Sequence, residues 1–319
     1  MGWGALTILT VVLPCFNAQR HLATAVQSIL AQTFQDFRLI VVNDGSTDRS
    51  REILACFDDP RITVLDHQRN MGIVAALNLA MGEVATPYVA RMDADDVSGH
   101  SRLERQVEFM LGHAKIGAVG TAFHEIDESG RRRRTIAVPT DDATLRRRLF
   151  FGNVFAHGSV MMRLEALQAA SFYSQADWPA EDYALWCRIA DRYELANLPD
   201  ALYEHRVYGT AISSEYKGDM RQARTRLMLH YGASHSLSPT PRQPLLQHMS
   251  LLRRSENDAH RRSARASMLA QWALAARLLR LGRTRDAASQ IVTAVRASTA
   301  RDSAAIGRLL LRAVAERRA

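Results

Sequence analysis

The chain has 319 residues, of which 47% are hydrophobic and 23% charged, and its formal net charge is +8 at pH 7. This is the composition of an ordinary globular protein, long enough for one large α/β domain with an appendage or for two domains. Three scattered cysteines without a C-x-x-C pair argue against a disulfide framework and a zinc site, and no segment reaches the length of a membrane-spanning helix. We therefore expect a protein of the reducing cytoplasm.

The predicted elements of the first hundred residues alternate between strands and helices. Strands are predicted at 7–13, 37–42, 62–65 and 88–92, and helices follow them near 22–30, 49–57, 73–80 and up to 111. The strand at 7–13 is continuously apolar, as expected of a strand buried on both faces. Asp48 is one candidate cap of the second helix, and Ser101 with Glu104 forms a capping-box pattern before the fourth. This alternation predicts a mostly parallel sheet.

Residues 113–150 are predicted to form further strands and turns. Ser129-Gly130 before the four arginines Arg131–Arg134 is typical of a hairpin tip, and Asp141 or Asp142 could cap a short helix that ends in the arginines 146–148. Both basic runs are interpreted as solvated surface, with contact to an anionic acceptor as the alternative.

The C-terminal third differs in composition and charge. After a segment rich in serine and proline at 233–244, the chain is rich in alanine, leucine and arginine and has helical periodicity. Residues 1–217 carry a net charge of −5, whereas residues 218–319, with 19 arginines and 6 acidic residues, carry +13. We therefore divide the chain into an α/β domain, residues 1–217, and a basic α-helical region, residues 218–319.

The charge of that basic region predicts an anionic partner, either a membrane surface or an acidic glycan. On this interpretation the protein is cytoplasmic and peripheral at the inner face of the cytoplasmic membrane, bound through its basic helices. The alternative is a soluble helical tail that uses arginine for solubility. Nucleic-acid binding is not expected, because only Tyr231 and Trp272 offer rings for stacking in this region.

Polar residues follow each of the four predicted strands. They are Pro14 and Asn17 after the first, 43–46 after the second, 66–70 after the third and 93–96 after the fourth. The carboxyl ends of parallel strands lie at one edge of a sheet, which is where open α/β sheets bind ligands. Four polar clusters at one edge are hard to explain as solvated turns, so the sequence predicts a binding site there.

The most informative of these clusters is Asp93-Ala94-Asp95-Asp96. Several carboxylates within four residues repel one another, which suggests a bound cation or a cationic group of a substrate. The alternative interpretation of so short a motif is a solvated acidic turn.

The ordered set of motifs resembles the family 2 glycosyltransferases, which have the GT-A fold. The resemblance covers about residues 6–215, and the matching segments are 11–17, 28–33, 40–48, 70–72 with Asn78, 90–96, 157–161, 181–188 and 198–207. It implies an α/β fold with a Rossmann-like, mostly parallel sheet flanked by helices, followed by a C-terminal α-helical appendage.

The resemblance also implies roles for individual residues. The donor nucleotide would be bound by Pro14, Asn17, Asp44, Asn70, Gly72, Asp93 and Arg206, with Asp44 on the base. Asp95 and Asp93 would hold a Mg²⁺ or Mn²⁺ ion that bridges the diphosphate. Asp182 would be the general base that takes a proton from the acceptor hydroxyl, with Glu181 beside it to orient the acceptor.

Local structural roles are the alternatives for two of these assignments. Asp44 in an Asn-Asp-Gly turn could cap a helix, and Glu181-Asp182 could be an acidic pair that complements a helix dipole. One position departs from the family pattern. Many relatives have a histidine two residues after the arginine that matches Arg206, whereas this chain has Tyr208, and His205 would lie on the opposite face of an extended segment.

The sequence therefore predicts an inverting, metal-dependent, hexosyltransferase-type glycosyltransferase. It would move a sugar from a nucleoside-diphosphate sugar, with a UDP-sugar favoured, to a hydroxyl of a glycan or lipid-linked acceptor in bacterial cell-surface polysaccharide synthesis. The Q-x-x-R-W signature of processive synthases is missing, which favours the addition of one or a few sugars.

Two other functions remain open at this point. A nucleotidyltransferase on a similar sheet would offer a glycine-rich, basic loop after its first strand. The segment Leu13–Asn17 is neither glycine-rich nor basic. A catalytically degenerate module that binds a nucleotide or a glycan is the non-enzymatic alternative, which the intact acidic residues disfavour. The donor sugar, the acceptor, the linkage and the oligomeric state are not predicted.

Overall fold

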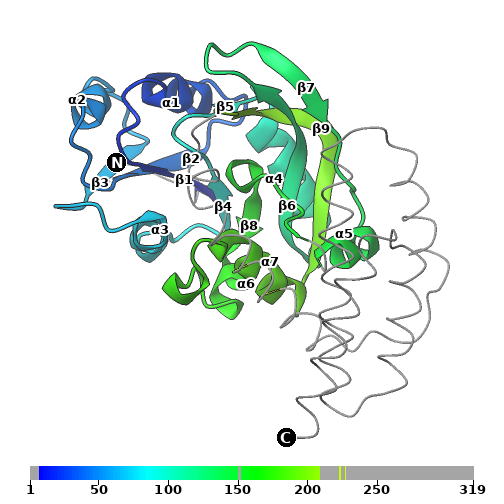
Figure 1. The fold of residues 1–319 in the computed structure, drawn as a ribbon. Coiled ribbons are helices and arrows are strands. Elements are labelled where there is room, and N and C mark those ends of the chain that lie inside the picture. The colour runs from blue at the N-terminus through cyan, green and yellow to red at the C-terminus, as the bar shows by residue number, and fades with distance from the viewer. Residues whose placement is uncertain (1–6, 150–151, 209–222, 224–226, 228–319) are drawn as a thin grey trace, which may run out of the picture. The chain divides into compact units, whose positions relative to one another are not determined.

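The computed structural model describes residues 7–149 and 152–208, together with Ala223 and Leu227 (Figure 1). The described residues form a nine-stranded sheet with the order β3-β2-β1-β4-β8-β6-β9-β5, and β7 pairs with β6 outside this path. Apart from Ala223 and Leu227, the predicted basic helical region 218–319 and its boundary lie outside the described residues.

The N-terminal half has the predicted strand and helix order. Its elements are β1 Leu9–Cys15, α1 Leu22–Leu30, β2 Phe37–Asn43, α2 Ser50–Ala55, β3 Ile62–Asp66, α3 Ile73–Gly82, β4 Tyr88–Arg91 and, after a short strand, α4 Arg102–Gly112. Strands β1, β2, β3 and β4 pair in parallel, as predicted. The parallel sheet expected from the first hundred residues is therefore confirmed.

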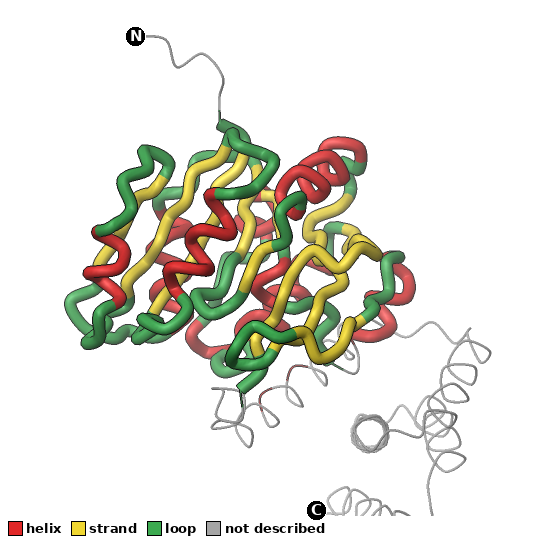
Figure 2. Tube along the Cα trace, turned by 90° about the horizontal axis from the view of Figure 1, so that it is seen from above, coloured by secondary structure: helices red, strands yellow, loops and turns green. Residues whose placement is uncertain are grey.

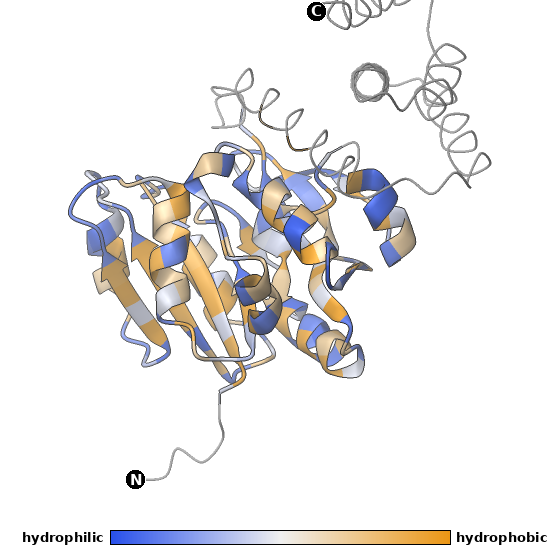
Figure 3. Cartoon of the chain, turned by 90° about the horizontal axis from the view of Figure 1, so that it is seen from below, coloured by the Kyte–Doolittle hydropathy of each residue, from blue (hydrophilic) through white to orange (hydrophobic). Residues whose placement is uncertain are grey.

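The parallel strands are covered by helices on both faces, which explains their continuous apolar sequences. Leu9, Val11 and Leu13 of β1 are fully buried in a cluster that includes residues of α1, α2 and α4. The opposite face packs against α3, which contacts β1 and β2. Figure 2 shows helices on both sides of these strands, and in Figure 3 the strands are mostly hydrophobic in colour.

The C-terminal half of the sheet is mixed. It contains β5 Val97–Ser98, β6 Ile116–Ile126, β7 Arg132–Ile136, β8 Met161–Arg163 and β9 Glu194–Arg206, with helices α5 Asp142–Leu149, α6 Leu164–Ala169 and α7 Glu181–Ala190 and the 3-10 turns η1 His157–Ser159 and η2 Gln175–Asp177. Strand β8 is antiparallel to both β4 and β6, whereas β6 and β9 are parallel. The sheet is therefore parallel on one side of β4 and mixed on the other.

One predicted helix cap and the hairpin are present, and two predicted caps are wrong. Asp141 accepts a hydrogen bond from the Thr144 amide at 2.8 Å. Asp48 accepts one from the Ser50 amide at 2.9 Å, but the N-cap residue of α2 is Arg49, and its side chain makes no cap bond. Gly130, with φ of +86°, lies in the turn between β6 and β7. The capping box at α4 does not form, because Ser101 makes no side-chain cap bond and Glu104 instead accepts from the Thr33 hydroxyl at 2.8 Å.

The sequence analysis also made predictions about disulfide bonds and membrane-spanning helices. All three cysteines are free, with Cys15 and Cys187 buried and Cys56 exposed. Among the described residues, none of the helices combines the length and the apolar character that crossing a membrane requires.

Gln32 connects three elements near the site edge. Its Nε2 donates to the Ser28 carbonyl, the Ser98 hydroxyl and the Gly99 carbonyl at 2.8–3.1 Å, and its Oε1 accepts from the Leu103 amide at 3.0 Å. The residue is 1% exposed. Gln32 thus joins the end of α1 to β5 and to the first turn of α4.

We expect Gln32→Ala to lower the free energy of unfolding by about 1–3 kcal/mol, because buried donors and acceptors would lose their partner. Gln27→Ala, at an exposed position of α1, should change it by no more than about 0.5 kcal/mol. Chemical denaturation of both variants measures the difference. Equal stabilities would show that Gln32 does not hold these elements together.

Candidate functional site

The side chain of Asp44, directly after β2, fixes the loop that follows β3. Its Oδ1 accepts from the Met71 amide at 2.9 Å and lies 2.6 Å from His67 Nδ1, while Oδ2 accepts from the Gly72 amide at 2.8 Å. Asp44 is 3% exposed. Instead of capping the helix of its own turn, it holds the segment that leads into α3.

The other residues predicted to bind the donor nucleotide lie around the same edge. Asn17, which has φ of +49°, accepts from the Thr47 amide at 2.9 Å, so the ends of β1 and β2 are joined. Asn70 accepts from the Gly72 amide at 2.9 Å. Pro14 is paired with Val42 inside the sheet. The structure therefore brings the first three polar clusters together, as the parallel topology predicts.

Gly45 allows this close approach. Its φ is +66°, and a Cβ at this position would lie 2.3 Å from the carbonyl carbon of Arg69. Only glycine has both the conformational freedom and the space for this contact. The turn after β2 and the loop after β3 can therefore lie against each other, backbone to backbone.

The acidic turn after β4 contains three carboxylates in three different environments. Asp96 is 1% exposed and accepts from the Arg206 amide at 2.7 Å and from His205 Nδ1 at 3.2 Å, so it anchors the end of β9. Asp93 is bound by Arg91, with 2.6 Å between Oδ1 and Nη2. Asp95 is the remaining carboxylate, and burial, together with the negative charge of Asp95, raises the pKa of the Tyr208 hydroxyl.

The pKa values of Asp95 and Asp93 are shifted in opposite directions. Burial and the negative charges of Asp96 and Asp93 raise the pKa of Asp95 to about 7. Burial would also raise the pKa of Asp93, but the charge of Arg91 outweighs it and lowers the pKa below the ordinary value. A cation would relieve the repulsion at Asp95, so the donor set fits a hard metal ion.

Among the described residues, no three His, Cys, Asp or Glu side chains converge as a complete metal site. Mg²⁺ is commonly held by only one or two carboxylates together with substrate phosphates and water, so the acidic turn does not need a third protein ligand.

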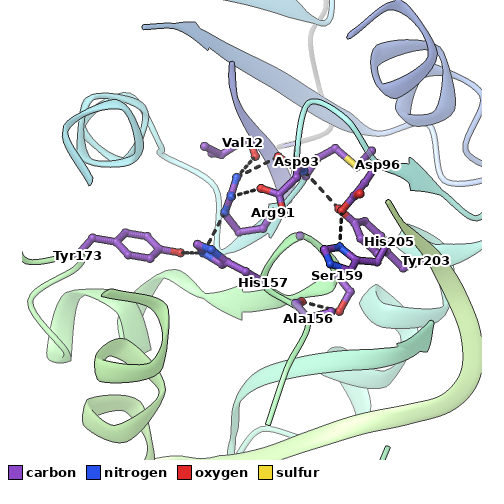
Figure 4. Close-up of polar contacts among 12 residues, drawn as sticks. Val12, Arg91, Asp93, Asp96, Ala156, His157, Ser159, Tyr173, Tyr203 and His205 are labelled. Carbon is purple, nitrogen blue, oxygen red and sulfur yellow. Dashed lines mark hydrogen bonds and ion pairs between the residues drawn. The ribbon is translucent and has the colours of Figure 1, made fainter. Parts of the chain in front are cut away.

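The sequence predicts that His205 lies on the face opposite Tyr208 if this segment is extended. His205 Nδ1 lies 3.2 Å from Asp96 Oδ2, so His205 contacts the acidic turn (Figure 4). Strand β9 ends at Arg206, and the alternation of an extended strand therefore does not continue to residue 208. Burial would lower the pKa of His205, but its hydrogen bond to Asp96 raises it to about 9.

Arg206 has a different environment from the one that the sequence predicts. Its Nε donates to the Asp95 carbonyl at 2.7 Å, and its Nη1 donates to the carbonyls of Asp127 and Glu128 at 2.8 and 3.0 Å. The residue is 5% exposed. Arg206 thus ties the acidic turn to the β6–β7 hairpin through Nε and Nη1, and its contact with the diphosphate stays a prediction.

The predicted catalytic acids lie in the first turn of α7. The amide of Asn153 donates to Asp182 Oδ2, a contact that the sequence analysis missed. Glu181 is 9% exposed, and burial, followed by the charge of Asp182, raises its pKa to about 7. Arg91 and Asp93 also influence the pKa of Glu181, so α7 faces the same region as the acidic turn.

The sequence analysis missed most of the buried polar residues beneath the site. Arg91 and Arg102 are fully buried, and Tyr173 and Tyr203 are at most 3% exposed. One signal was available in the sequence. Arg91 is a charged residue at the end of an apolar strand, and such a residue is almost never buried without a partner.

The described fold is an α/β fold whose site combines an acidic turn with polar loops at the carboxyl edge of a parallel sheet. Residues 10–169 match the family model described as Glycosyl transferase family 2. The chain therefore belongs to glycosyl transferase family 2, and its mixed α/β sheet is that of the GT-A fold.

Two relatives illustrate the similarity in sequence. An uncharacterized glycosyltransferase of Haemophilus influenzae is 28% identical over 231 residues, which cover 69% of this chain and 72% of the relative. WbnJ of Escherichia coli, an O-antigen biosynthesis glycosyltransferase, is 29% identical over 213 residues, which cover 65% and 83%.

Two solved structures share the fold at low sequence identity. TarS residues 1–349 from S. aureus, in complex with UDP-GlcNAc, has a TM-score of 0.62 and 16% identity, with 91% of this chain and 89% of TarS covered. The mannosyltransferase PcManGT from Pyrobaculum calidifontis, in complex with GDP-Man and Mn²⁺, has a TM-score of 0.55 and 18% identity, with 99% and 90% covered.

Gly158, in η1, provides a test of the packing beneath the acidic turn. A Cβ at this position would lie 1.8 Å from the Tyr203 hydroxyl and 2.6 Å from Asp93 Oδ2. We expect Gly158→Ala to destabilise the protein by about 1–3 kcal/mol and to displace Asp93. Gly82→Ala, where a Cβ would meet no atom within 4 Å, is the matched control. Thermal unfolding compares the two, and an unchanged Tm for Gly158→Ala would contradict this packing.

Proposed function

We propose that this glycosyltransferase is an inverting, metal-dependent enzyme that moves a sugar from a nucleoside-diphosphate sugar to a hydroxyl of a glycan or lipid-linked acceptor. The observation that carries the proposal is the placement of two acidic groups in one region. Asp93 after β4 is linked by hydrogen bonds through Arg91 and His157 to Tyr173. Burial and the charge of Asp182 in α7 raise the pKa of Tyr173. Asp93 would act at the diphosphate of the donor, and Asp182 would act on the hydroxyl of the acceptor.

The donor nucleotide would bind at the edge formed by the loops after β1, β2 and β3. Asp44, Asn70 and Gly72 are already organised there by hydrogen bonds, with Pro14 and Asn17 beside them. Gly72 has φ of +89° and open space at its Cβ position, which allows a ligand to approach the backbone closely. We favour a UDP-sugar, in line with the UDP-GlcNAc bound by TarS, although the GDP-Man of PcManGT makes a guanosine donor the first alternative.

Asp95, supported by Asp93, would hold the Mg²⁺ or Mn²⁺ ion. Such an ion neutralises the diphosphate and so makes it a better leaving group. The chain contributes an oriented pair of carboxylates, in which Arg91 fixes Asp93 and Arg206 fixes the backbone at Asp95. PcManGT has Mn²⁺ in its complex, which supports the choice of ion.

Asp182 would accept the proton of the attacking hydroxyl. A sugar hydroxyl is a weak nucleophile, and general-base catalysis typically contributes about 10²–10⁴-fold. Asn153 donates to one oxygen of Asp182 and orients it, while Glu181 would position the acceptor. Attack from the side opposite the leaving group would invert the anomeric centre.

We place the reaction in bacterial cell-surface polysaccharide synthesis, and the O-antigen biosynthesis named for the relative WbnJ supports this setting. The protein would act in the cytoplasm, peripheral at the inner face of the cytoplasmic membrane, with the +13 charge of residues 218–319 as the basis for membrane contact. The domain division at residue 217 belongs to the same proposal.

Asp182→Asn should lower turnover by about 10²–10⁴-fold, because the amide cannot accept the proton. Binding of the nucleotide sugar should stay close to that of the wild type, since Asp182 is not among the residues proposed to bind the nucleotide. Turnover and donor affinity are measured on the same samples. Asp200→Asn, which changes a surface carboxylate paired with Arg105, is the control. Full turnover of Asp182→Asn would exclude Asp182 as the base.

Asp95→Ala should abolish the part of nucleotide binding that depends on Mn²⁺ or Mg²⁺. The measurement is a thermal-shift panel of nucleoside diphosphates and nucleotide sugars with and without each ion, because ligand binding to the native state raises Tm by mass action. The exposed Asp58→Ala is the matched control. A metal-independent shift, equal in wild type and Asp95→Ala, would remove Asp95 from this role. No shift with any nucleotide would favour a degenerate binding module.

A further inference from the structure

Arg91 is a fully buried cation that connects Asp93 of the acidic turn to the carbonyl of Val12 and to His157. Its Nη2 donates to Asp93 Oδ1 at 2.6 Å, and its Nη1 donates to the carbonyls of Val12 and Met92 at 3.1 and 3.0 Å. Its Nε donates to His157 Nε2 at 3.2 Å. A buried charge is costly unless it is paired and hydrogen-bonded, and Arg91 satisfies both conditions.

His157 has its proton fixed by two donors. Its Nε2 accepts from Arg91 and also lies 2.8 Å from the Tyr173 hydroxyl. A guanidinium can only donate, so Nε2 carries no proton, the Tyr173 hydroxyl donates to it, and the imidazole is neutral with its proton on Nδ1. Burial, and then the charge of Arg91, lower the pKa of His157 to about 4, which agrees with this assignment.

Tyr173 is held by two helices that are distant in sequence. Asn78 of α3 donates to the Tyr173 carbonyl at 2.8 Å and accepts from its amide at 3.3 Å. Arg188 of α7 donates to the carbonyls of Ala170 and Phe172 at 2.8 and 2.7 Å.

The turn before Tyr173 has an uncommon backbone conformation. Ser171 and Phe172 have φ of +58° and +56°, values that non-glycine residues keep only where the surroundings impose them. The bonds from α7 and α3 impose them here, so the position of the Tyr173 hydroxyl is set by these helices rather than by its own turn.

We propose that Arg91, His157 and Tyr173 form a positioning relay for Asp93. The relay holds Asp93 Oδ1 on Arg91 and leaves Oδ2 above Gly158, so that the turn presents its carboxylates to the metal and the diphosphate in one orientation (Figure 4). The relay ends at Tyr173, and the turn before Tyr173 is bound by α7, the helix that carries Asp182. The affinity for the donor therefore depends on contacts made by α7. This inference rests on the proposed function of Asp93.

A substitution that removes a single polar group can distinguish a positioning role of the relay from a purely structural role. Support alone would affect the free energy of unfolding, whereas positioning affects the metal-dependent affinity for the donor. Residues that orient metal ligands from outside commonly alter metal affinity or activity by about 10–100-fold. Tyr173 is one step further from Asp93, so we expect roughly a three- to tenfold effect there.

Tyr173→Phe removes only the hydroxyl at the end of the relay. The dissociation constant of UDP in the presence of Mn²⁺, measured by calorimetry on the full chain, should rise by roughly three- to tenfold, and the KM for the donor should rise more than kcat falls. Tyr88→Phe is the matched control, because Tyr88 is a buried tyrosine whose hydroxyl also contacts an arginine, Arg163, at 3.2 Å. Both variants should have similar Tm values.

A pair of variants at His157 tests the acceptor atom itself. The amide oxygen of Gln can reach the place of Nε2 and accept from both Arg91 and Tyr173, so His157→Gln should retain most of the Mn²⁺-dependent affinity for UDP. His157→Leu leaves both donors without an acceptor and should lose more affinity than Tyr173→Phe.

The outcomes separate the relay from the proposed function. If wild type binds UDP with Mn²⁺ and Tyr173→Phe binds it equally well, the relay is overturned and the proposed function stands. Equal losses in Tyr173→Phe and Tyr88→Phe, or in His157→Gln and His157→Leu, would reduce the network to structural support and also overturn the relay. If wild type binds no nucleoside diphosphate with either ion, the proposed function fails and the relay fails with it.

Discussion

The site depends on the balance between one buried cation and a turn of three carboxylates. Arg91 is fully buried and bound to Asp93, while Asp96 is bound to the end of β9. These two contacts bind the outer acids of the turn, while burial and the negative charges of both acids leave Asp95 with a raised pKa and a need for positive charge. Because water cannot solvate the buried groups, each charge must find a partner in the protein or in a ligand. This requirement connects β4, β9, η1 and the turn before α7.

The change from a parallel to a mixed sheet makes this arrangement possible. The parallel strands β1–β4 bring their carboxyl ends to one edge, which supplies the nucleotide loops and the acidic turn. Strand β8 then pairs antiparallel with β4, so η1, with His157 and Gly158, enters next to that turn. Strand β9 returns parallel to β6 and ends at Arg206, beside Asp96. One half of the sheet thus provides the polar loops and the acidic turn, and the other half supplies η1 and the end of β9 beside that turn.

Several residues serve the site through the backbone rather than by facing a ligand. Arg206 holds three carbonyls, Asp96 holds the end of β9, and Asp44 holds the loop before α3. Motif matching assigned ligand contacts to two of them. The structure adds that both are first of all contacts between loops, which places them in the organisation of the site whatever ligand it binds.

The sequence alone determined the order of the N-terminal strands and helices, the parallel sheet and the polar clusters at its edge, because apolar periodicity and strand ends are local properties. It also determined the family, since the motifs keep their order and spacing. Tertiary structure decided which acid pairs with which cation. Asp93, Asp95 and Asp96 look alike in sequence, and only the approach of Arg91, His205 and Arg206 separates their roles. The relay from Arg91 to Tyr173 joins residues up to 82 positions apart, and its last bond depends on two φ values near +57° that no local pattern predicts.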